Sequence, residues 1–307
     1  MIMKPTAIIT ADIGLQEGQP VCRLDNYWEA QARKILWLKE LQEQYGCPIL
    51  DGGDLFEQWK ASPFLLQWAL QNLPDGIITT PGNHDLKAHN LDLYDQGGLA
   101  VLENAGKVQV PQTFVTYNGD FDIFPFPWGT STGPLDLEWR RKFERSKTGK
   151  SVALVHTMTY VGRSPFPGCI DPGAMTLLKQ MQGYDLIIVG HNHKPFIVEH
   201  EGRKLISPGS LTRTTADQID YRPQVYLWYA EDNSVEPVYV PIEDNVVSRD
   251  HLEIVENREA RISAFVERLG GEFEVSLSFR NNLQNFFGEN RVRKAVQDLV
   301  WGSVDGQ

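Results

Sequence analysis

Three features that mark other protein classes are missing from this sequence. No apolar run approaches the roughly 18 residues needed to cross a bilayer, and the first residues lack the apolar segment and cleavage site of a signal peptide. The 307 residues include only three cysteines, which are widely spaced and form no CxxC pair, so they suggest no disulfide framework. We therefore expect a cytoplasmic protein with buried thiols and no membrane association.

The sequence also lacks an excess of positive charge. Its formal net charge is -11 at pH 7, which argues against a broad basic surface for nucleic acid. A nucleic-acid enzyme is still compatible with this charge, because bound divalent cations or a basic partner subunit can supply positive charge locally. The densest basic stretch, at 139–150, contains Arg140 and Arg141. A solvated helix end followed by a loop is favoured there over a specific phosphate contact.

What the sequence does contain is an alternation of strand-like and helix-like segments. The expected strands are mostly continuous apolar runs, which are typical of strands buried on both faces. They lie at 6–11, 47–52, 76–81, 121–126, 151–156 and 185–190. Helices are predicted at 26–46, 63–72, 135–146 and 173–182. This order predicts an α/β sandwich with a mixed sheet.

The pattern changes after residue 203. Strands with turns at Pro208-Gly209 and Asp232-Asn233 complete a first domain, which we place at 1–243. A small α+β module is predicted at 244–307. Its expected order is a strand at 251–256, a helix at 259–269, a strand at 272–279 and a helix at 289–302.

Polar side chains follow five of the expected buried strands. In open α/β sheets the carboxyl ends of the strands border the crevice where ligands bind, so we expect these side chains to lie together. They are Asp12, Asp54, Asn83, His84, Asp85, His156, His191 and His193. Oxygen and imidazole ligands suit Mn, Fe or Zn better than Mg or Ca alone. Each motif is weak by itself, whereas the ordered set is specific.

In the order D, GD, GNHD, H and GHxH, these motifs resemble those of the calcineurin-like metallophosphoesterase superfamily, across residues 6 to about 215. The resemblance implies a four-layer αββα sandwich that holds two divalent metal ions. It implies the following ligands: Asp54 bridging both ions, Asn83, His156 and His191 on one ion, and Asp12 and His193 on the other. It also implies that His84, beside Asp85, faces the scissile phosphate as a general acid or transition-state stabiliser.

Shorter strings are similar to one branch, the SbcD-type DNA repair nucleases and their phage counterparts. These strings are GDLF (53–56), PFPW (125–128) and LISPGSLTRT (205–214), together with the small module. This resemblance implies an exo- and endonuclease that acts on DNA with Mn, or with Fe or Mg instead. It implies an SbcC-type ATPase partner and, for a phage protein, the host-cell cytoplasm. The sequence leaves the oligomeric state open, with a homodimer as one alternative. Arg213, Arg140 and Arg141 would then be contacts to the DNA backbone.

Two other classes stay open. One is a phosphatase or small-molecule phosphodiesterase of the same fold, which the acidic charge suits. The other is a non-catalytic binding subunit with an impaired metal site.

Gly14 motivates that last alternative. Most members of the superfamily have a metal-binding histidine two residues after the first acid, where this chain has Gly14. Glu57, three residues after Asp54, is a carboxylate that can fill the vacancy, and it would favour Mn or Fe over Zn. The alternative is that Glu57 is a solvated or capping acid, and both interpretations stay open.

Overall fold

The computed structural model describes residues 4–136, 147–252 and 279–305. The chain divides into two compact units, Met1–Ser248 and Arg249–Gln307. The polar residues that follow the predicted strands all belong to the first unit. The boundary between residues 243 and 244 stays a prediction.

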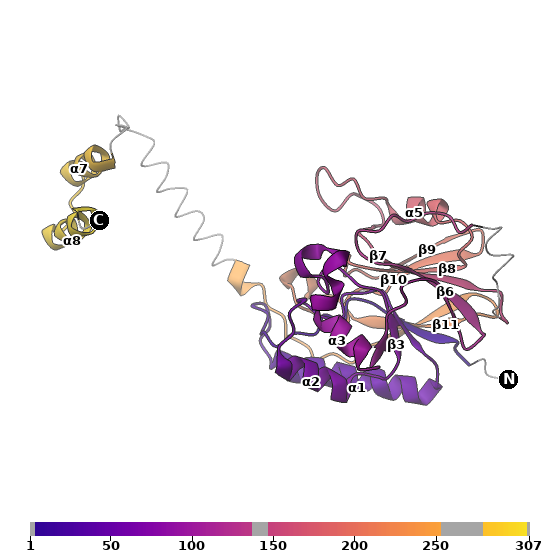
Figure 1. Cartoon of the computed structure of the whole chain (residues 1–307). Helices are drawn as coiled ribbons and strands as arrows, with labels where there is room; N and C mark the ends of the chain where they lie inside the picture. The colour runs from indigo at the N-terminus through magenta and orange to yellow at the C-terminus, as the bar shows by residue number, and fades with distance from the viewer. Residues whose placement is uncertain (1–3, 137–146, 253–278, 306–307) are drawn as a thin grey trace. The chain divides into compact units, whose positions relative to one another are not determined.

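Two mixed sheets form the first unit (Figure 1). The first sheet has the strand order β12-β11-β1-β2-β3-β4, in which β1 to β4 run parallel while β11 is antiparallel to β1 and to β12. Its strands are β1 (Ala7–Thr10), β2 (Ile49–Asp51), β3 (Ile77–Thr79), β4 (Val108–Gln109), β11 (Gln224–Tyr229) and β12 (Ser234–Tyr239).

The second sheet has the order β5-β6-β7-β8-β10-β9, with four central parallel strands and antiparallel strands at both edges. Its strands are β5 (Val115–Tyr117), β6 (Phe121–Phe126), β7 (Ser151–His156), β8 (Leu186–Gly190), β9 (Phe196–His200) and β10 (Arg203–Ser207).

Helices cover the outer faces of the two sheets, with α1 and α2 on one side and α5 on the other (Figure 1). The α-helices of this unit are α1 (Tyr27–Tyr45), α2 (Pro63–Asn72), α3 (Gly98–Asn104) and α5 (Ala174–Gln180). Short 3-10 helices are η1 (Lys87–His89), η2 (Leu91–Gln96) and η3 (Ala216–Gln218). Helix α1 begins where the Asn26 side chain accepts the Glu29 N–H, and it ends at Gly46 in the left-handed conformation.

Side-chain alternation explains why the strands are continuous apolar runs. In β1, Ala7 and Ile9 pack between the two sheets, whereas Ile8 packs against the helices α1 to α3. In β8, Ile188 faces the inter-sheet core and Ile187 faces α5. Successive residues of a strand point to opposite faces, and both faces of each sheet are buried here. The layers therefore run helix, sheet, sheet, helix, which confirms the expected αββα sandwich.

The central strands and the helices α1, α2 and α5 match their predicted ranges, but some elements differ. The strands β4, β5 and β9 and the helix α3 were not expected from the sequence. In the helix predicted at 135–146, residues 135 and 136 are not helical, and the rest, with Arg140 and Arg141, lies outside the described residues.

In the second unit the described residues include two helices, α7 (Phe279–Glu289) and α8 (Lys294–Asp305). Helix α8 overlaps the predicted helix at 289–302, and α7 was not expected. The strand predicted at 251–256 is wrong at residues 251 and 252, which are helical; its remainder lies outside the described residues. The strand predicted at 272–279 lies outside them too, except for Phe279, the first residue of α7.

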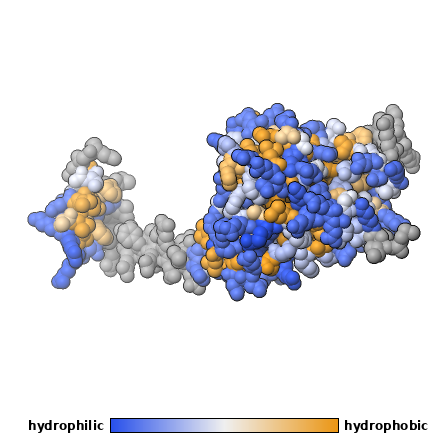
Figure 2. Space-filling model, turned by 90° about the horizontal axis from the view of Figure 1, so that it is seen from below, coloured by the Kyte–Doolittle hydropathy of each residue, from blue (hydrophilic) through white to orange (hydrophobic). Residues whose placement is uncertain are grey.

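Apolar residues are interspersed with hydrophilic ones over the surface that includes α1 and α2 (Figure 2). Exposed examples include Leu36 of α1 and Phe64 of α2. None of the helices in the described part of the chain has both the length and the apolar composition that crossing a bilayer requires.

Candidate metal centre

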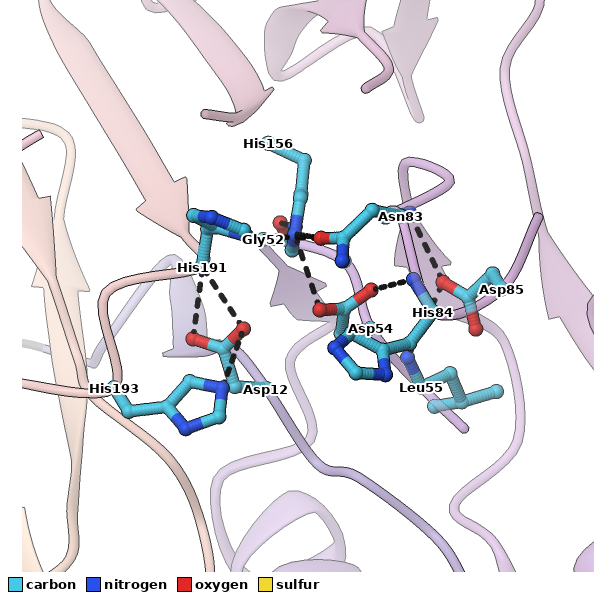
Figure 3. A network of polar contacts seen from close by, with 12 residues as sticks. Asp12, Gly52, Asp54, Leu55, Asn83, His84, Asp85, His156, His191 and His193 are labelled. Carbon is cyan, nitrogen blue, oxygen red and sulfur yellow. Dashed lines mark hydrogen bonds and ion pairs between the residues drawn. The ribbon is translucent and has the colours of Figure 1, made fainter. Parts of the chain in front are cut away.

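The polar residues predicted from the strand ends lie close together (Figure 3). Asp12 follows β1, Asp54 follows β2, and Asn83, His84 and Asp85 follow β3, in three adjacent parallel strands. In the other sheet, His156 is the last residue of β7, and His191 and His193 follow the neighbouring strand β8. The site is thus assembled from the carboxyl ends of parallel strands in both sheets.

The loops after β1 and β2 hold the two aspartates in an unusual backbone conformation. Asp12 and Asp54 have positive φ angles of 49° and 57°, and His191 and His193 have 95° and 58°. Non-glycine residues rarely adopt such angles, and they persist only where the surroundings enforce them. The surroundings here include hydrogen bonds between the loops, from the Asp12 N–H to the Gly53 carbonyl and from the Gly14 N–H to the Asp54 carbonyl, at 3.0 and 2.9 Å.

Glycine is required where Asp54 meets the loop after β3. A Cβ added to Gly82 would lie only 2.0 Å from Asp54 Oδ1. The same Asp54 oxygen accepts the backbone N–H of His84 at 2.8 Å. The glycine before Asn83 therefore lets the loop approach the carboxylate closely enough to bind it.

One group of ligand atoms lies around Asn83 Oδ1. His156 Nε2 is 3.1 Å and His191 Nδ1 is 2.8 Å from this oxygen, and Asp54 Oδ2 is 3.2 Å from His156 Nε2. His156 Nδ1 lies 2.8 Å from the Gly52 carbonyl. Since a carbonyl can only accept, this nitrogen carries the proton, and the Nε2 of a neutral ring presents a lone pair to the oxygens.

Asp54 also belongs to a second group, with Asp12 and His193. His193 Nε2 is 3.8 Å from Asp12 Oδ1, and the Asp12 carboxylate accepts the His191 N–H at 2.9 and 3.1 Å. The ligand atoms within each group lie within 4.8 Å of one another. Asp54 is shared by the two groups, in the position predicted for a bridging ligand.

The electrostatics of the groups fit bound cations. Asp54 Oδ2 is buried and has no hydrogen-bond partner among the described residues. Burial raises the pKa of Asp12. Burial alone would lower the pKa of His156, but the Asp54 carboxylate outweighs it and raises that pKa to about 9. The raised pKa of His156 means that, without an ion, a proton would lie between its Nε2 and the Asp54 carboxylate. A divalent cation can take the place of that proton, so two divalent ions fit this donor set.

His84 stands beside this donor set with its ring held in one orientation. Its Nδ1 lies 2.7 Å from the Glu57 carbonyl oxygen, so Nδ1 is the donor and Nε2 is the other ring nitrogen. Burial would lower the pKa of His84, but the Asp54 carboxylate and the Glu57 carbonyl raise it above the ordinary value.

In the described part of the chain, the Asp85 carboxylate makes no hydrogen bond to the His84 ring. Its fully buried carboxylate accepts the backbone N–H groups of Leu55, Phe56 and Gly82 at 3.3, 3.1 and 3.0 Å. Burial, followed by the negative charge of Asp54, raises the pKa of Asp85 to about 7. Asp85 thus ties the loop after β2 to the loop after β3, which carries His84.

Glu57 lies beside the vacancy at Gly14. A Cβ added to Gly14 would be 3.4 Å from Glu57 Oε2. The side chain is partly buried, and its burial raises the pKa of the carboxyl. Glu57 does not belong to either close group of ligand atoms, so its role as a ligand stays a hypothesis.

Trp128 is a site residue that we did not single out from the sequence. Its ring centroid lies 4.9 Å from that of His191 and 6.2 Å from that of His156. Its backbone N–H donates to the Pro81 carbonyl at 2.9 Å, next to the loop after β3. The sequence could have pointed to Trp128 through the PFPW string, of which it is the last residue. The string does not reveal where in the fold that residue lies.

Arg213 does not have the exposure that a DNA-backbone contact normally has. It is only 5% exposed, and its guanidinium donates to the carbonyls of Ile219 and Glu243 at 3.2 and 2.8 Å. Its predicted role in DNA binding is untested, and Arg140 and Arg141 lie outside the described residues.

Comparison with known proteins identifies the family. The profile of the calcineurin-like phosphoesterases matches residues 7–195. The chain belongs to this family. The matched range contains every residue of the two ligand groups, so the calcineurin-like phosphoesterase fold and the candidate metal centre coincide in one unit. No curated protein sequence matched the chain.

The solved structures that the chain matches include a phosphodiesterase and a 5'-nucleotidase precursor. A protein of Thermus thermophilus is 15% identical, with 76% of this chain and 98% of that chain covered and a TM-score of 0.47. An archaeal phosphodiesterase is 14% identical, with 76% and 98% covered and a TM-score of 0.37. A 5'-nucleotidase precursor, also from Thermus thermophilus, is 15% identical, with 87% and 59% covered and a TM-score of 0.44.

Proposed function

We propose that this calcineurin-like phosphoesterase is a DNA phosphodiesterase, an SbcD-like exo- and endonuclease that uses two divalent ions, preferably Mn. The observation that carries the proposal is that all three strings that resemble the SbcD-type nucleases lie at the metal centre. The GDLF string contains the ligand Asp54. Trp128 of the PFPW string packs on His191. The LISPGSLTRT segment donates its Leu211 N–H to the Asp12 carbonyl at 3.2 Å.

The ligand groups define what the site can do. Asp54, Asn83, His156 and His191 would hold one ion, and Asp12, Asp54 and His193 the other. When bound, a pair of such ions supplies positive charge that neutralises a phosphodiester and activates water. Asp54 is suited to the shared position because a carboxylate has two oxygens and a negative charge.

His84 is the residue of this chain placed to transfer a proton. Its backbone N–H is tied to Asp54 Oδ1 and its Nδ1 to the Glu57 carbonyl. The ring therefore cannot rotate freely, and Nε2 is the atom that can donate a proton to the leaving oxygen of a phosphodiester or stabilise its charge. The raised pKa of His84 favours the protonated form that such a donor needs.

The proposal includes a partner subunit. A net charge of -11 leaves little general attraction for DNA, so an SbcC-type ATPase partner, or the dimer of this chain, would supply much of the DNA-binding surface. Phosphate groups would then reach the metal centre after the DNA is held by other residues.

The test is an assay of the full chain with Mn on linear duplex DNA, single-stranded DNA, a chromogenic phosphodiester and a nucleotide monophosphate. We expect DNA and the phosphodiester to be cleaved and the monoester to be a poor substrate. His84→Gln should lower the rate on DNA by roughly 100-fold or more, the usual contribution of a general acid. His200→Gln, in the edge strand β9, is the matched control and should keep the rate.

Absence of DNA cleavage with every divalent metal would refute the proposal. Hydrolysis of the nucleotide or the chromogenic ester without DNA cleavage would identify a phosphatase or small-molecule phosphodiesterase, the class that the acidic charge favours. If the unmodified chain cleaves none of these substrates and binds only one metal ion, it would be a metal-impaired binding subunit, the class that Gly14 favours.

A further inference from the structure

A cavity of about 260 Å³ lies in the first unit. Helix α1 lines it with residues one turn apart on one face, namely Ala30, Arg33, Lys34 and Trp37. The segment before α1, the segment after β10 and the segment after β12 complete the wall. None of the lining residues belongs to the ligand groups of the metal centre.

The charges around this cavity do not balance. Four cationic side chains line it, together with two acidic ones. Both acids are already engaged: Asp25 binds Arg23 at 2.5 and 2.7 Å, and Glu243 binds Arg33 at 2.7 Å. The two remaining cations, Lys34 and Arg213, account for an excess of two positive charges in a chain that is acidic as a whole.

These two cations are buried as well as unbalanced. Lys34 is 6% and Arg213 is 5% exposed. Neither has a carboxylate within ion-pair distance in the described part of the chain. The Lys34 ammonium donates to the Leu211 carbonyl at 3.4 Å, and Nε of Arg213 has no hydrogen-bond partner among the described residues. Buried charges are costly unless something opposes them.

Burial and repulsion from the neighbouring cations both act on the pKa of Lys34. Burial, followed by the positive charges of Arg23 and Arg213, lowers the pKa of its ammonium to about 7. A bound anion would remove this repulsion and restore the charged form. A dianion would balance the two cations that have no carboxylate partner.

We propose that this cavity binds a phosphate dianion, either as free phosphate or as the phosphate group of a nucleoside monophosphate. Phosphate suits the site better than a carboxylate does, since it carries two charges near neutral pH and accepts hydrogen bonds from several directions. The volume leaves room for an attached organic group. Trp37, which is partly exposed, provides an aromatic surface on which a nucleobase can stack.

One residue, Leu211, links the wall of the cavity to the backbone of the metal ligand Asp12. The Leu211 carbonyl accepts from Lys34, while the Leu211 N–H donates to the Asp12 carbonyl. A phosphate at the metal centre could therefore be confused with one in the cavity. The binding experiment must be done without metal.

The experiment measures phosphate binding to the full chain in EDTA by isothermal titration calorimetry, with inorganic phosphate in one arm and adenosine monophosphate in the other. We expect one saturable site in the unmodified chain. Lys34→Gln should weaken binding tenfold or more, whereas Lys39→Gln on the same helix should leave it unchanged, because Lys39 does not line the cavity. Circular dichroism establishes that the variants are folded.

Arg33→Gln is a second test that does not depend on a buried residue. The side chain of Arg33 is 53% exposed, so its replacement should spare the fold and weaken binding severalfold. Tighter binding of the nucleotide than of phosphate would support a nucleotide site, and equal affinity a site for free phosphate. Absence of binding in EDTA, or equal affinity in the Lys34 and Lys39 variants, would overturn the proposal. No cleavage is measured, so these outcomes are independent of the nuclease test.

Discussion

Lys34 should make the stability of this protein depend on pH in the alkaline range. Its pKa falls from 10.5 to about 7, through burial first and then through neighbouring cations. The charged groups that face it are those that line the cavity, Arg23, Asp25, Arg33, Arg213 and Glu243. In the unfolded chain Lys34 has an ordinary pKa, so the perturbation to test is the removal of this one amine by Lys34→Met.

The sign follows from the number of bound protons. Between pH 7 and 10.5 the unfolded chain holds the Lys34 proton and the folded chain has released it, so the free energy of unfolding rises with pH. Below pH 7 both states are protonated and the cost of burying the charge is constant. At about 1.4 kcal/mol per pKa unit, the contribution should change by roughly 3 kcal/mol between pH 6.5 and pH 9.5. This is an upper limit, because local rearrangement relieves part of the cost.

The assay is urea unfolding of the unmodified chain and of Lys34→Met at pH 6.5, 8 and 9.5, in buffers without phosphate. All other titrating groups are common to the two proteins, so their difference isolates Lys34. We expect the unmodified chain to gain stability relative to the variant as the pH rises. The lost hydrogen bond to Leu211 shifts the variant equally at every pH. Parallel curves for the two proteins would show that Lys34 keeps its ordinary pKa, and would refute the reasoning.

Three further predictions concern the metal centre. Asp54→Asn should lower the content of both Mn ions after dialysis, measured by mass spectrometry, whereas His193→Ala should lower only one; equal losses would contradict a shared Asp54. Glu57→Ala should lower the content by one ion relative to Glu43→Ala, an exposed glutamate on α1, and unchanged occupancy would exclude Glu57 as a ligand. Asp85→Ala leaves three buried N–H groups without an acceptor, so it should lower the free energy of unfolding by roughly 3 to 9 kcal/mol at 1–3 kcal/mol per group. A loss below about 1 kcal/mol in urea unfolding would be inconsistent with the hydrogen bonds seen.

The fold was largely predictable because the buried strands leave a strong signal. Strands such as β7 and β8 are apolar on both faces, so they stand out as continuous runs with no competing interpretation. The edge strand β9 was missed, because its residues alternate between partial burial and exposure and give only a weak pattern. Helix α3 was missed because its seven residues contain few polar positions that would reveal an amphipathic period.

The site was predictable to the level of which residues meet, but not of how each one is held. The order of the motifs along the chain places Asp12, Asp54 and His156 at the strand ends. It does not reveal that the carboxylate of Asp85 binds backbone N–H groups rather than the ring of His84. That arrangement depends on the positive φ of Asp54 and on the close approach of Gly82 to the Asp54 carboxylate. Both are properties of the folded loops rather than of the residue pattern.

The loop after β2 connects two features of this centre. One is the missing ligand at Gly14, and the other is the orientation of the His84 ring. The side chain of Glu57 lies beside Gly14, while the carbonyl of the same residue lies 2.7 Å from the His84 ring. A histidine introduced at position 14 would meet the Glu57 carboxylate and would also require a residue with a Cβ to adopt a φ of +60°.

Gly14→His alone should therefore not restore the common ligand set. Asp85 holds the loop that carries Glu57, because its carboxylate binds the N–H groups of Leu55 and Phe56 directly before Glu57. An Asp85 variant that still folds should therefore lose both metal affinity and the fixed orientation of His84, although its side chain is not a member of either ligand group.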